Sequence, residues 1–458
     1  MRSGELGFWW RSLGGPPPPR PPLSEACEAD VIIVGAGYTG LWTAYYLARE
    51  RPSLKIVVLE REFAGFGASG RNGGWVSGFF SGPSRVYERR GAAGGFTAMQ
   101  RAMFATVKEL ADVLATEGID ADLRNDGHLS VALNAAQVAR QREALRNARR
   151  GGLSEHDLSE LTAEQLAERV RIAGALGATF SPHVARVHPA KLLVGLARAV
   201  ESLGVQIYED TPVSEIRPHQ AITPAGPVSA RWIVRATEGY TASLRGLKRA
   251  LVPMNSSMIV TEPLPQAAWE EIGWQGAEVL GDAAHVYVYL QRTADGRIAI
   301  GGRGVPYRYG SRTDGEGETA AATVASLRRK LVGLFPSLGA VPIDHAWSGV
   351  LGVPRDWCIS VDADPASGLA WAGGYVGEGV ATANLAGRTL RDLILGLPSE
   401  LTALPWVGRR PARWEPEPLR WSAIRTVYSL YRHADRTEAR SGRPSRLGQL
   451  VDAATRRE

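Results

Sequence analysis

The residues with the clearest chemical meaning are Gly35, Gly37 and Gly40, which lie in the run GAGYTG directly after the apolar residues 31–34. A glycine-rich turn between a buried strand and a helix presents backbone N–H groups and the positive end of the helix to a phosphate. Gly35 permits the tight turn, Gly37 lets the backbone approach a pyrophosphate, and Gly40 lets the helix pack on the strand. The spacing therefore predicts a dinucleotide site.

Glu60 strengthens this prediction because it ends a second apolar run, residues 56–59, and lies 25 residues beyond Gly35. An acid at this place accepts hydrogen bonds from the hydroxyls of an adenosine ribose. The order strand, turn, helix, strand, acid favours a dinucleotide-binding unit over a purely structural turn.

A second glycine-rich turn, GGYVGEG at residues 373–379, leads into another helical pattern. The partial positive charge of that helix end could stabilise the negative charge that a reduced flavin gains at its N1–C2=O edge. The small residues after this turn also fit simple close packing of the helix, and both interpretations can hold together.

Strands and helices alternate at the beginning, middle and end of the chain, with more antiparallel patterns between them. The expected fold is α/β: a discontinuous Rossmann-like dinucleotide domain (28–80, 185–245 and 345–408) interleaved with an antiparallel-sheet α+β substrate domain (81–184 and 246–344).

The two ends of the chain differ from this body. Residues 1–27 are rich in proline and predict a mostly disordered leader, although Phe8, Trp9 and Trp10 could instead dock on the body or on a partner. Residues 409–458 form a basic extension whose predicted helix carries Trp421, Ile424, Tyr428 and Tyr431 on one face. Such a face either packs on its own protein or makes peripheral contact with a membrane.

Composition excludes several classes of protein. The net charge of +6 belongs to the tail, where 12 arginines from residue 409 onward stand against 6 acidic residues, so nucleic-acid binding is not expected. Two cysteines support neither a disulfide framework nor a cysteine-rich metal site, and we expect no metal. No apolar run reaches the roughly 20 residues of a transmembrane segment, and no secretory signal is evident, so a cytoplasmic protein is expected.

The turn with Glu60 and the runs ASGRNGGW (68–75), VYLQRTADGRIAIGG (288–302), LFPSL (334–338) and GGYVGEGV (373–380) together resemble the D-amino-acid-oxidase (DAO) family of FAD-dependent oxidoreductases. Within it they are most similar to the gamma-glutamylputrescine-oxidase-like amine oxidoreductases. The resemblance covers about residues 29–397. It implies FAD lying across the dinucleotide domain, with the flavin ring facing the substrate sheet.

The same resemblance assigns cofactor-binding positions, in chain order from the pyrophosphate turn and the adenosine end to the flavin ring: Gly35, Gly37, Tyr38, Thr39, Gly40, Glu60, Arg61, Ala68, Ser69, Arg71, Asn72, Gly73, Gly74, Val213, Thr237, Gly239, Gly374, Gly377, Gly379 and Val380. Ser348 stands nearest the place where some relatives carry a flavin-linking cysteine, which implies noncovalent FAD.

The expected substrate is a small amine or amino acid. An amine must be neutral before its neighbouring carbon loses hydride, and an apolar aromatic pocket lowers the pKa of the amine by desolvation. Tyr287 and Tyr289 share one side of a predicted strand and could form such a wall, although a half-exposed sheet face gives the same pattern. Together with Trp75, Arg303 and Glu378 they are the candidate catalytic residues.

The expected reaction is hydride transfer to flavin N5, giving an imine and then a carbonyl, with O2 or another acceptor reoxidising the flavin. Two alternatives remain open: a membrane-associated FAD dehydrogenase that donates to quinone, and a non-catalytic flavin-binding subunit.

Overall fold

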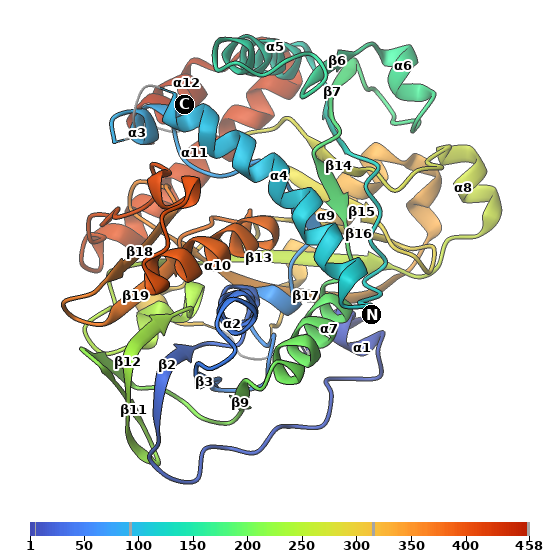
Figure 1. Ribbon diagram of the computed structural model, residues 1–458. Coiled ribbons are helices and arrows are strands. Elements are labelled where there is room, and N and C mark those ends of the chain that lie inside the picture. The colour runs from blue at the N-terminus through green and yellow to red at the C-terminus, as the bar shows by residue number, and fades with distance from the viewer. Residues whose placement is uncertain (5, 91–93, 314–316, 456–458) are drawn as a thin grey trace.

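The computed structural model describes residues 1–4, 6–90, 94–313 and 317–455, and two large sheets organise it (Figure 1). One is an eight-stranded sheet around a parallel centre. Its strands are, in spatial order, β10 (Glu215–Arg217), β11 (Gln220–Thr223), β12 (Gly226–Arg235), β2 (Glu28–Val34), β3 (Ile56–Leu59) and β9 (Gln206–Tyr208), with β19 (Leu369–Gly373) on β12 and β18 (Ser360–Asp364) on β19.

The other sheet has nine strands and is mainly antiparallel. In spatial order they are β1 (Arg2–Ser3), β17 (Ile343–Val353), β13 (Val252–Thr261), β16 (Ile298–Gly302), β15 (Val288–Arg292), β14 (Val279–Asp282), β5 (His128–Ala132), β7 (Gly177–Ser181) and β6 (Ser159–Leu161). A two-stranded sheet joins β4 (Trp75–Ser77) to β8 (Val184–Arg186).

The apolar run of β2 is continuous because both faces of this strand are covered. Val31 and Ile33 belong to the main apolar core, whereas Ile32 and Val34 belong to a separate core on the other face. Helices α2 (Tyr38–Glu50), α7 (Pro189–Ser202) and α10 (Gly379–Leu395) pack together beside this sheet, and α4 (Gly95–Thr116) lies against α10 (Figure 1). The expected α/β class with a Rossmann-like unit is thus confirmed.

Further helices lie around the nine-stranded sheet. These are α5 (Ala135–Arg150), α6 (Ala163–Ala167), α8 (Gln266–Ile272) and α9 (Ala321–Leu334), while α3 (Ser84–Glu88) precedes α4.

One predicted domain boundary is wrong. Residues from 345 onward were assigned to the dinucleotide domain, but β17 pairs with β13 along its whole length in the nine-stranded sheet. The chain returns to the dinucleotide domain only after Val353, because β18 and β19 are the next strands to join the eight-stranded sheet.

The prediction of a disordered leader is also wrong. Residues 2 and 3 form β1, which adds to the edge of β17, and α1 (Phe8–Arg11) buries Phe8, Trp9 and Trp10 to within 4% exposure. The proline-rich residues that follow form no helix or strand, but Arg20 anchors them to the body through Glu201 and Glu209. The alternative that the aromatic residues dock on the body therefore holds.

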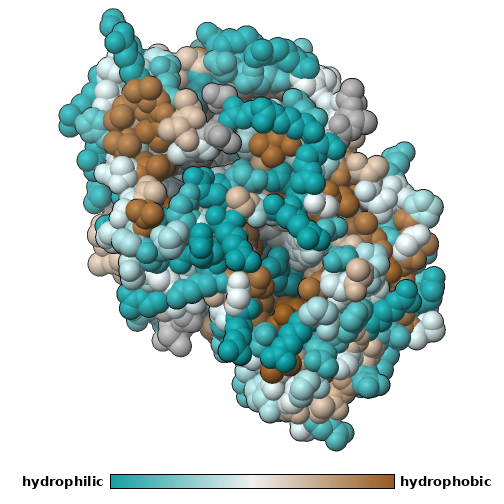
Figure 2. All heavy atoms as spheres, turned by 90° about the vertical axis from the view of Figure 1, so that its left-hand side faces the viewer, coloured by the Kyte–Doolittle hydropathy of each residue, from teal (hydrophilic) through white to brown (hydrophobic). Residues whose placement is uncertain are grey.

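The C-terminal extension forms α11 (Leu419–Ser441) and α12 (Arg446–Thr455), which pack against each other. Ile424, Tyr428 and Tyr431 on α11 are buried in the protein itself, so of the two alternatives this face packs on its own protein, and contact with a membrane is not supported. Among the described residues, no helix combines the length and apolar character that crossing a bilayer requires. Figure 2 shows one face of the molecule, on which hydrophilic side chains predominate and hydrophobic ones gather in patches and in a central hollow.

Candidate active site

The turn between β2 and α2 depends on glycine at its first position. Gly35 adopts φ +107°, and a Cβ there would lie 2.7 Å from the carbonyl oxygen of Ala236. A Cβ at Gly40 would lie 1.9 Å from the oxygen of Gly35, so Gly40 serves the close approach of helix and turn. At the helix end, the N–H of Tyr38 donates to Ser69 Oγ over 2.9 Å. The glycines thus let the turn and the start of α2 lie close together, and Ser69 lies against the helix N-terminus.

Glu60 is fixed at the end of β3 beside this turn. Its carboxylate accepts hydrogen bonds from the N–H groups of Ala36, at 2.8 Å, and Glu62, at 3.1 Å. Burial raises the pKa of Glu60, and these backbone hydrogen bonds oppose that shift. The carboxyl group is therefore held where the sequence predicted an acceptor for ribose.

A cavity of about 1100 Å³ begins at this turn and extends toward α10. Fifteen of the predicted cofactor positions line it: Gly35, Gly37, Tyr38, Thr39, Glu60, Arg61, Ala68, Ser69, Asn72, Val213, Thr237, Gly239, Gly377, Gly379 and Val380. Tyr240, which the sequence did not single out, also lines it and lies under the guanidinium of Arg61, 5.0 Å from the ring centre. The cavity thus joins the pyrophosphate turn to the second glycine-rich turn.

Five predicted cofactor positions do not line this cavity. Gly40 acts in packing, and Gly73 and Arg71 border a neighbouring cavity instead. Arg71, one of the predicted cofactor-binding positions, is buried, and its guanidinium donates to the carbonyl oxygens of Phe66 and Ser348. The N–H of Gly74 donates to Asn72 Oδ1, and the N–H of Gly374 donates to the carboxylate of Glu238. Both glycines therefore belong to the backbone that surrounds the cavity.

The loop of residues 65–74 is held from behind by three side chains. They donate hydrogen bonds to three consecutive backbone carbonyl oxygens. Trp347 Nε1 donates to the carbonyl of Arg71 at 3.0 Å, Trp9 Nε1 to that of Asn72 at 2.8 Å, and Gln291 Nε2 to that of Gly73 at 2.7 Å. Trp10 packs beneath the same loop, since a Cβ at Gly70 would lie 2.4 Å from its indole nitrogen. The N-terminal segment is therefore part of the wall behind the cavity.

Glu238, which lies between the predicted cofactor positions Thr237 and Gly239, is a site residue that the sequence analysis did not name. Its carboxylate accepts the N–H groups of Gly374 and Tyr375, both at 2.9 Å, and that of Gly352. Burial raises the pKa of Glu238 to about 7, against the effect of these hydrogen bonds. It joins the end of β12 to the second glycine-rich turn, and its only sequence signal is its place three residues after the end of an apolar strand.

A second cavity, of about 750 Å³, adjoins the first and shares Ala68, Asn72, Leu351, Gly377 and Val380 with it. All five predicted catalytic positions line it: Trp75, Tyr287, Tyr289, Arg303 and Glu378. They come from β4, from β15 and the loop before it, from the end of β16 and from the start of α10, so four separate stretches of chain converge here.

Tyr289 stands at the centre of this wall. Its ring passes close to Gly73 and Gly301, where a Cβ would lie 2.8 Å and 2.2 Å from ring carbons, and it meets Trp75 edge to face at 6.0 Å. Its hydroxyl hydrogen bonds with Ser256 Oγ at 2.8 Å, a residue that the sequence analysis missed because Ser256 has no distinguishing motif. Burial raises the pKa of Tyr289 to about 12, so it stays neutral at physiological pH.

Besides Arg71, the charged residues Glu378 and Arg303 line this cavity. Burial raises the pKa of Glu378, the residue that precedes α10, and Ser77 opposes the shift through a hydrogen bond. Arg303 donates to the carbonyl oxygens of Asn255, at 3.3 Å, and Val376, at 3.4 Å. These bonds are long, which leaves much of the hydrogen-bonding capacity of the guanidinium directed at the cavity.

The start of α10 borders the cavities, and the same helix packs closely on α2. Gly379 and Val380 line the cavities at the helix N-terminus, whereas at Gly387 a Cβ would lie 2.8 Å from the backbone of Trp42, so α10 also packs closely on α2.

Comparison with known proteins agrees with this geometry. The family model described as "FAD dependent oxidoreductase" (DAO) matches residues 30–393. Gamma-glutamylputrescine oxidoreductase of Escherichia coli (strain K12) is 30% identical over 384 residues, covering 82% of this chain and 85% of that protein. Glycine oxidase of Bacillus subtilis (strain 168) is 22% identical over 377 residues, covering 80% and 93%. The crystal structure of glycine oxidase from Geobacillus kaustophilus shares the fold, with a TM-score of 0.70 and 21% identity over 84% of this chain and 100% of that one.

Proposed function

Because this chain belongs to the DAO family of FAD-dependent oxidoreductases, we propose that it oxidises the C–N bond of a small amine that also carries an anionic group. One observation carries this proposal. The second cavity, next to the flavin end of the first, is lined by the carboxyl group of Glu378 and by the guanidinium groups of Arg303 and Arg71. Arg71 is turned to the carbonyl oxygens of Phe66 and Ser348, whereas the hydrogen bonds of Arg303 are long, so we assign the cationic role to Arg303. A molecule with an amino group and an acidic group complements both charges.

The first cavity fits FAD held without a covalent bond. The glycine-rich turn at Gly35 and Gly37, together with Ser69, would meet the pyrophosphate, Glu60 the ribose, and Arg61 with Tyr240 the adenine end. The flavin end would lie among Ala68, Asn72, Gly377 and Val380, which border both cavities. When bound there, FAD supplies the two-electron acceptor for hydride from the carbon beside the amine nitrogen, and water hydrolyses the resulting imine to a carbonyl.

The chain's own residues prepare the amine. For an amine with a pKa near 10.4, loss of the proton at pH 7 costs about 4–5 kcal/mol. The apolar rings of Trp75 and Tyr289 exclude water and so lower the pKa of a bound amine. Glu378, whose pKa is raised by burial, can accept the ammonium proton, and Arg303 would orient the substrate through its acidic group.

The decisive experiment is anaerobic mixing of the purified holoprotein with amino acids, polyamines and their acylated derivatives, monitored by loss of flavin absorbance. We expect flavin reduction by at least one amine that bears a carboxylate, and weaker reduction by the matching amide. Rapid reoxidation in air would identify an oxidase, and slow reoxidation a dehydrogenase. A flavin that dithionite reduces but no amine in the panel does would refute the proposal.

A further inference from the structure

Two loops at the mouth of the second cavity are held by the C-terminal extension. The first, residues 283–287 between β14 and β15, ends at Tyr287, whose side chain lines the cavity and is 39% exposed. The second follows β16 and begins with Arg303. Both residues are candidates for contact with substrate.

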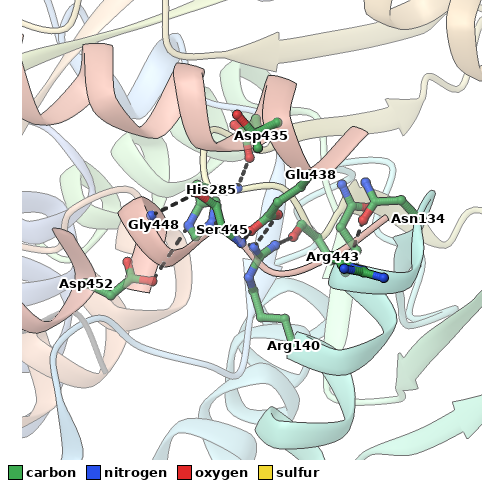
Figure 3. Close-up of polar contacts among 12 residues, drawn as sticks. Asn134, Arg140, His285, Asp435, Glu438, Arg443, Ser445, Gly448 and Asp452 are labelled. Carbon is green, nitrogen blue, oxygen red and sulfur yellow. Dashed lines mark hydrogen bonds and ion pairs between the residues drawn. The ribbon is translucent and has the colours of Figure 1, made fainter. Parts of the chain in front are cut away.

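Asp435 of α11 binds the backbone of the first loop directly. Its two carboxylate oxygens accept the N–H groups of His285, at 2.8 Å, and of Val286, at 3.0 Å (Figure 3). Both bonded residues lie within two positions of Tyr287. A carboxylate that takes two adjacent backbone N–H groups fixes the conformation of the loop more firmly than a side-chain contact would.

The imidazole of His285 is enclosed by the same extension. Its Nε2 lies 3.1 Å from Glu438 Oε1, and its ring stacks on Tyr431 with the centroids 5.3 Å apart. Arg140 of α5 donates to Glu438 Oε2 at 2.7 Å and also bonds the carbonyl oxygen of Ala283 in the loop (Figure 3). The loop is thus clamped between α5 and α11.

This cluster resembles a metal site only in composition. Ligand atoms of His285, Asp435 and Glu438 lie within 4.8 Å of one another. However, Arg140 Nη2 lies 2.8 Å from His285 Nε2, and both oxygens of Asp435 accept backbone N–H groups. A guanidinium already supplies the positive charge, so the cluster is an ionic clamp.

The extension holds the second loop in a similar way. Arg432, three residues before Asp435 on α11, donates to the carbonyl oxygen of Gly304 at 2.7 Å, next to Arg303. Glu417 accepts the hydroxyl of Tyr307 at 2.6 Å and the N–H of Gly310 at 3.1 Å. Tyr307 also shares an apolar core with Ile424 and Tyr428 of α11 and with Val286 of the first loop.

We propose that the C-terminal extension is a specificity element that sets the positions of Tyr287 and Arg303 at the mouth of the substrate cavity. The family match ends at residue 393, so the extension lies outside the part of the chain that matches the family model, while the cofactor cavity lies within it. Asp435 and Arg432 are positioning residues that act through the two loops. The effect of the extension on KM for substrate rests on the proposed function. Its effect on the conformation of the two loops does not.

The test compares Asp435→Asn and Arg432→Ala with Arg436→Ala in the full-length holoprotein. Arg436 is an exposed arginine of the same helix, and no hydrogen bond or ion pair involves it within the described part of the chain. Three measurements are made: hydrogen exchange of residues 283–287 and 303–310, acrylamide quenching of the bound flavin, and KM and kcat with the amine that best reduces the wild-type flavin.

We expect amide exchange in residues 283–287 to rise about ten-fold in Asp435→Asn, because an asparagine retains only one of the two acceptors. Quenching should increase, and KM should rise about five-fold or more while kcat and FAD content stay within about two-fold. Arg436→Ala should match the wild type. Unchanged exchange and quenching would overturn the proposal, as would faster exchange with unchanged KM. Failure of every amine to reduce the wild-type flavin would instead refute the proposed function, and exchange and quenching would still decide whether the extension holds the mouth.

Discussion

Replacement of Trp9 by phenylalanine should weaken FAD binding even though Trp9 does not line the cofactor cavity. The indole Nε1 donates to the carbonyl oxygen of Asn72 over 2.8 Å, and Asn72 borders both cavities. Phenylalanine keeps most of the apolar packing of a side chain that is 1% exposed but removes the donor. The loop of residues 65–74 then loses one of the three hydrogen bonds that hold its consecutive carbonyl groups.

The size of the effect follows from that single bond. A neutral hydrogen bond contributes about 1 kcal/mol, and leaving its acceptor buried without a partner costs about 1–3 kcal/mol. If this cost falls on the binding-competent conformation of the loop, the apparent Kd for FAD rises about five-fold or more. Trp9→Ala adds the loss of aromatic packing, about 3–5 kcal/mol, and should lower the melting temperature as well.

The assay is titration of apoprotein with FAD, followed by flavin fluorescence, together with thermal unfolding of the same samples. Trp269→Phe is the matched control, because Trp269 is also buried but lies on α8 in the apolar core of the substrate domain. It should lower stability without changing the Kd for FAD. Equal FAD affinity in Trp9→Phe and Trp269→Phe would show that the N-terminal segment supports the fold but not the cofactor loop.

Three further outcomes are expected. Gly35→Ala should purify without flavin, since its Cβ would meet the oxygen of Ala236 at 2.7 Å, whereas Gly246→Ala, also at positive φ but with open space around it, should keep its flavin absorbance. Burial raises the pKa of Glu238 to about 7 in the folded protein. The protonated Glu238 side chain therefore adds to the free energy of unfolding below its unfolded pKa of about 4.3, and this contribution is lost as the pH rises through 7. Denaturant unfolding of Glu238→Gln apoprotein should therefore depend less on pH between these values, and an unchanged dependence would contradict the assignment. Arg303→Met should raise KM about ten-fold or more for amines that carry a carboxylate and leave KM for uncharged analogues nearly unchanged, as steady-state kinetics across the panel would reveal.

The dinucleotide unit was predictable because its determinants are local. The turn, the strand before it and Glu60 all lie within about 30 residues, and each part constrains the next through its spacing. Fifteen of the twenty predicted cofactor positions accordingly line one cavity. Residues whose surroundings come from distant parts of the chain were predicted less well. Arg71 lies in a glycine-rich loop that suggests phosphate, yet Phe66 and Ser348, 277 residues later, provide its acceptors.

The two largest errors have the same physical origin. The apolar pattern of β17 suits either sheet, and only its partner β13, some 90 residues earlier, decides between them. The leader carries a proline run that favours extended chain, but Phe8 and Trp9 find the ring of Trp347, at 6.3 Å and 6.0 Å, more than 330 residues away. Hydrophobic patterns report that a surface must be buried and do not identify what covers it.

The sequence of α11 contains a further pattern that distinguishes a protein surface from a membrane as the partner of this helix. Ile424, Tyr428 and Tyr431 continue at the same helical spacing into Asp435 and Glu438, so one face of α11 begins apolar and ends acidic. A membrane surface would accept the first half of that face but would repel two carboxylates, because lipid headgroup regions favour basic residues beside an apolar stripe. Only a protein surface that offers apolar side chains followed by N–H donors and a cation can satisfy the whole face. The structure supplies such a surface in Val286, in the backbone of His285 and in Arg140, next to Tyr287 at the second cavity.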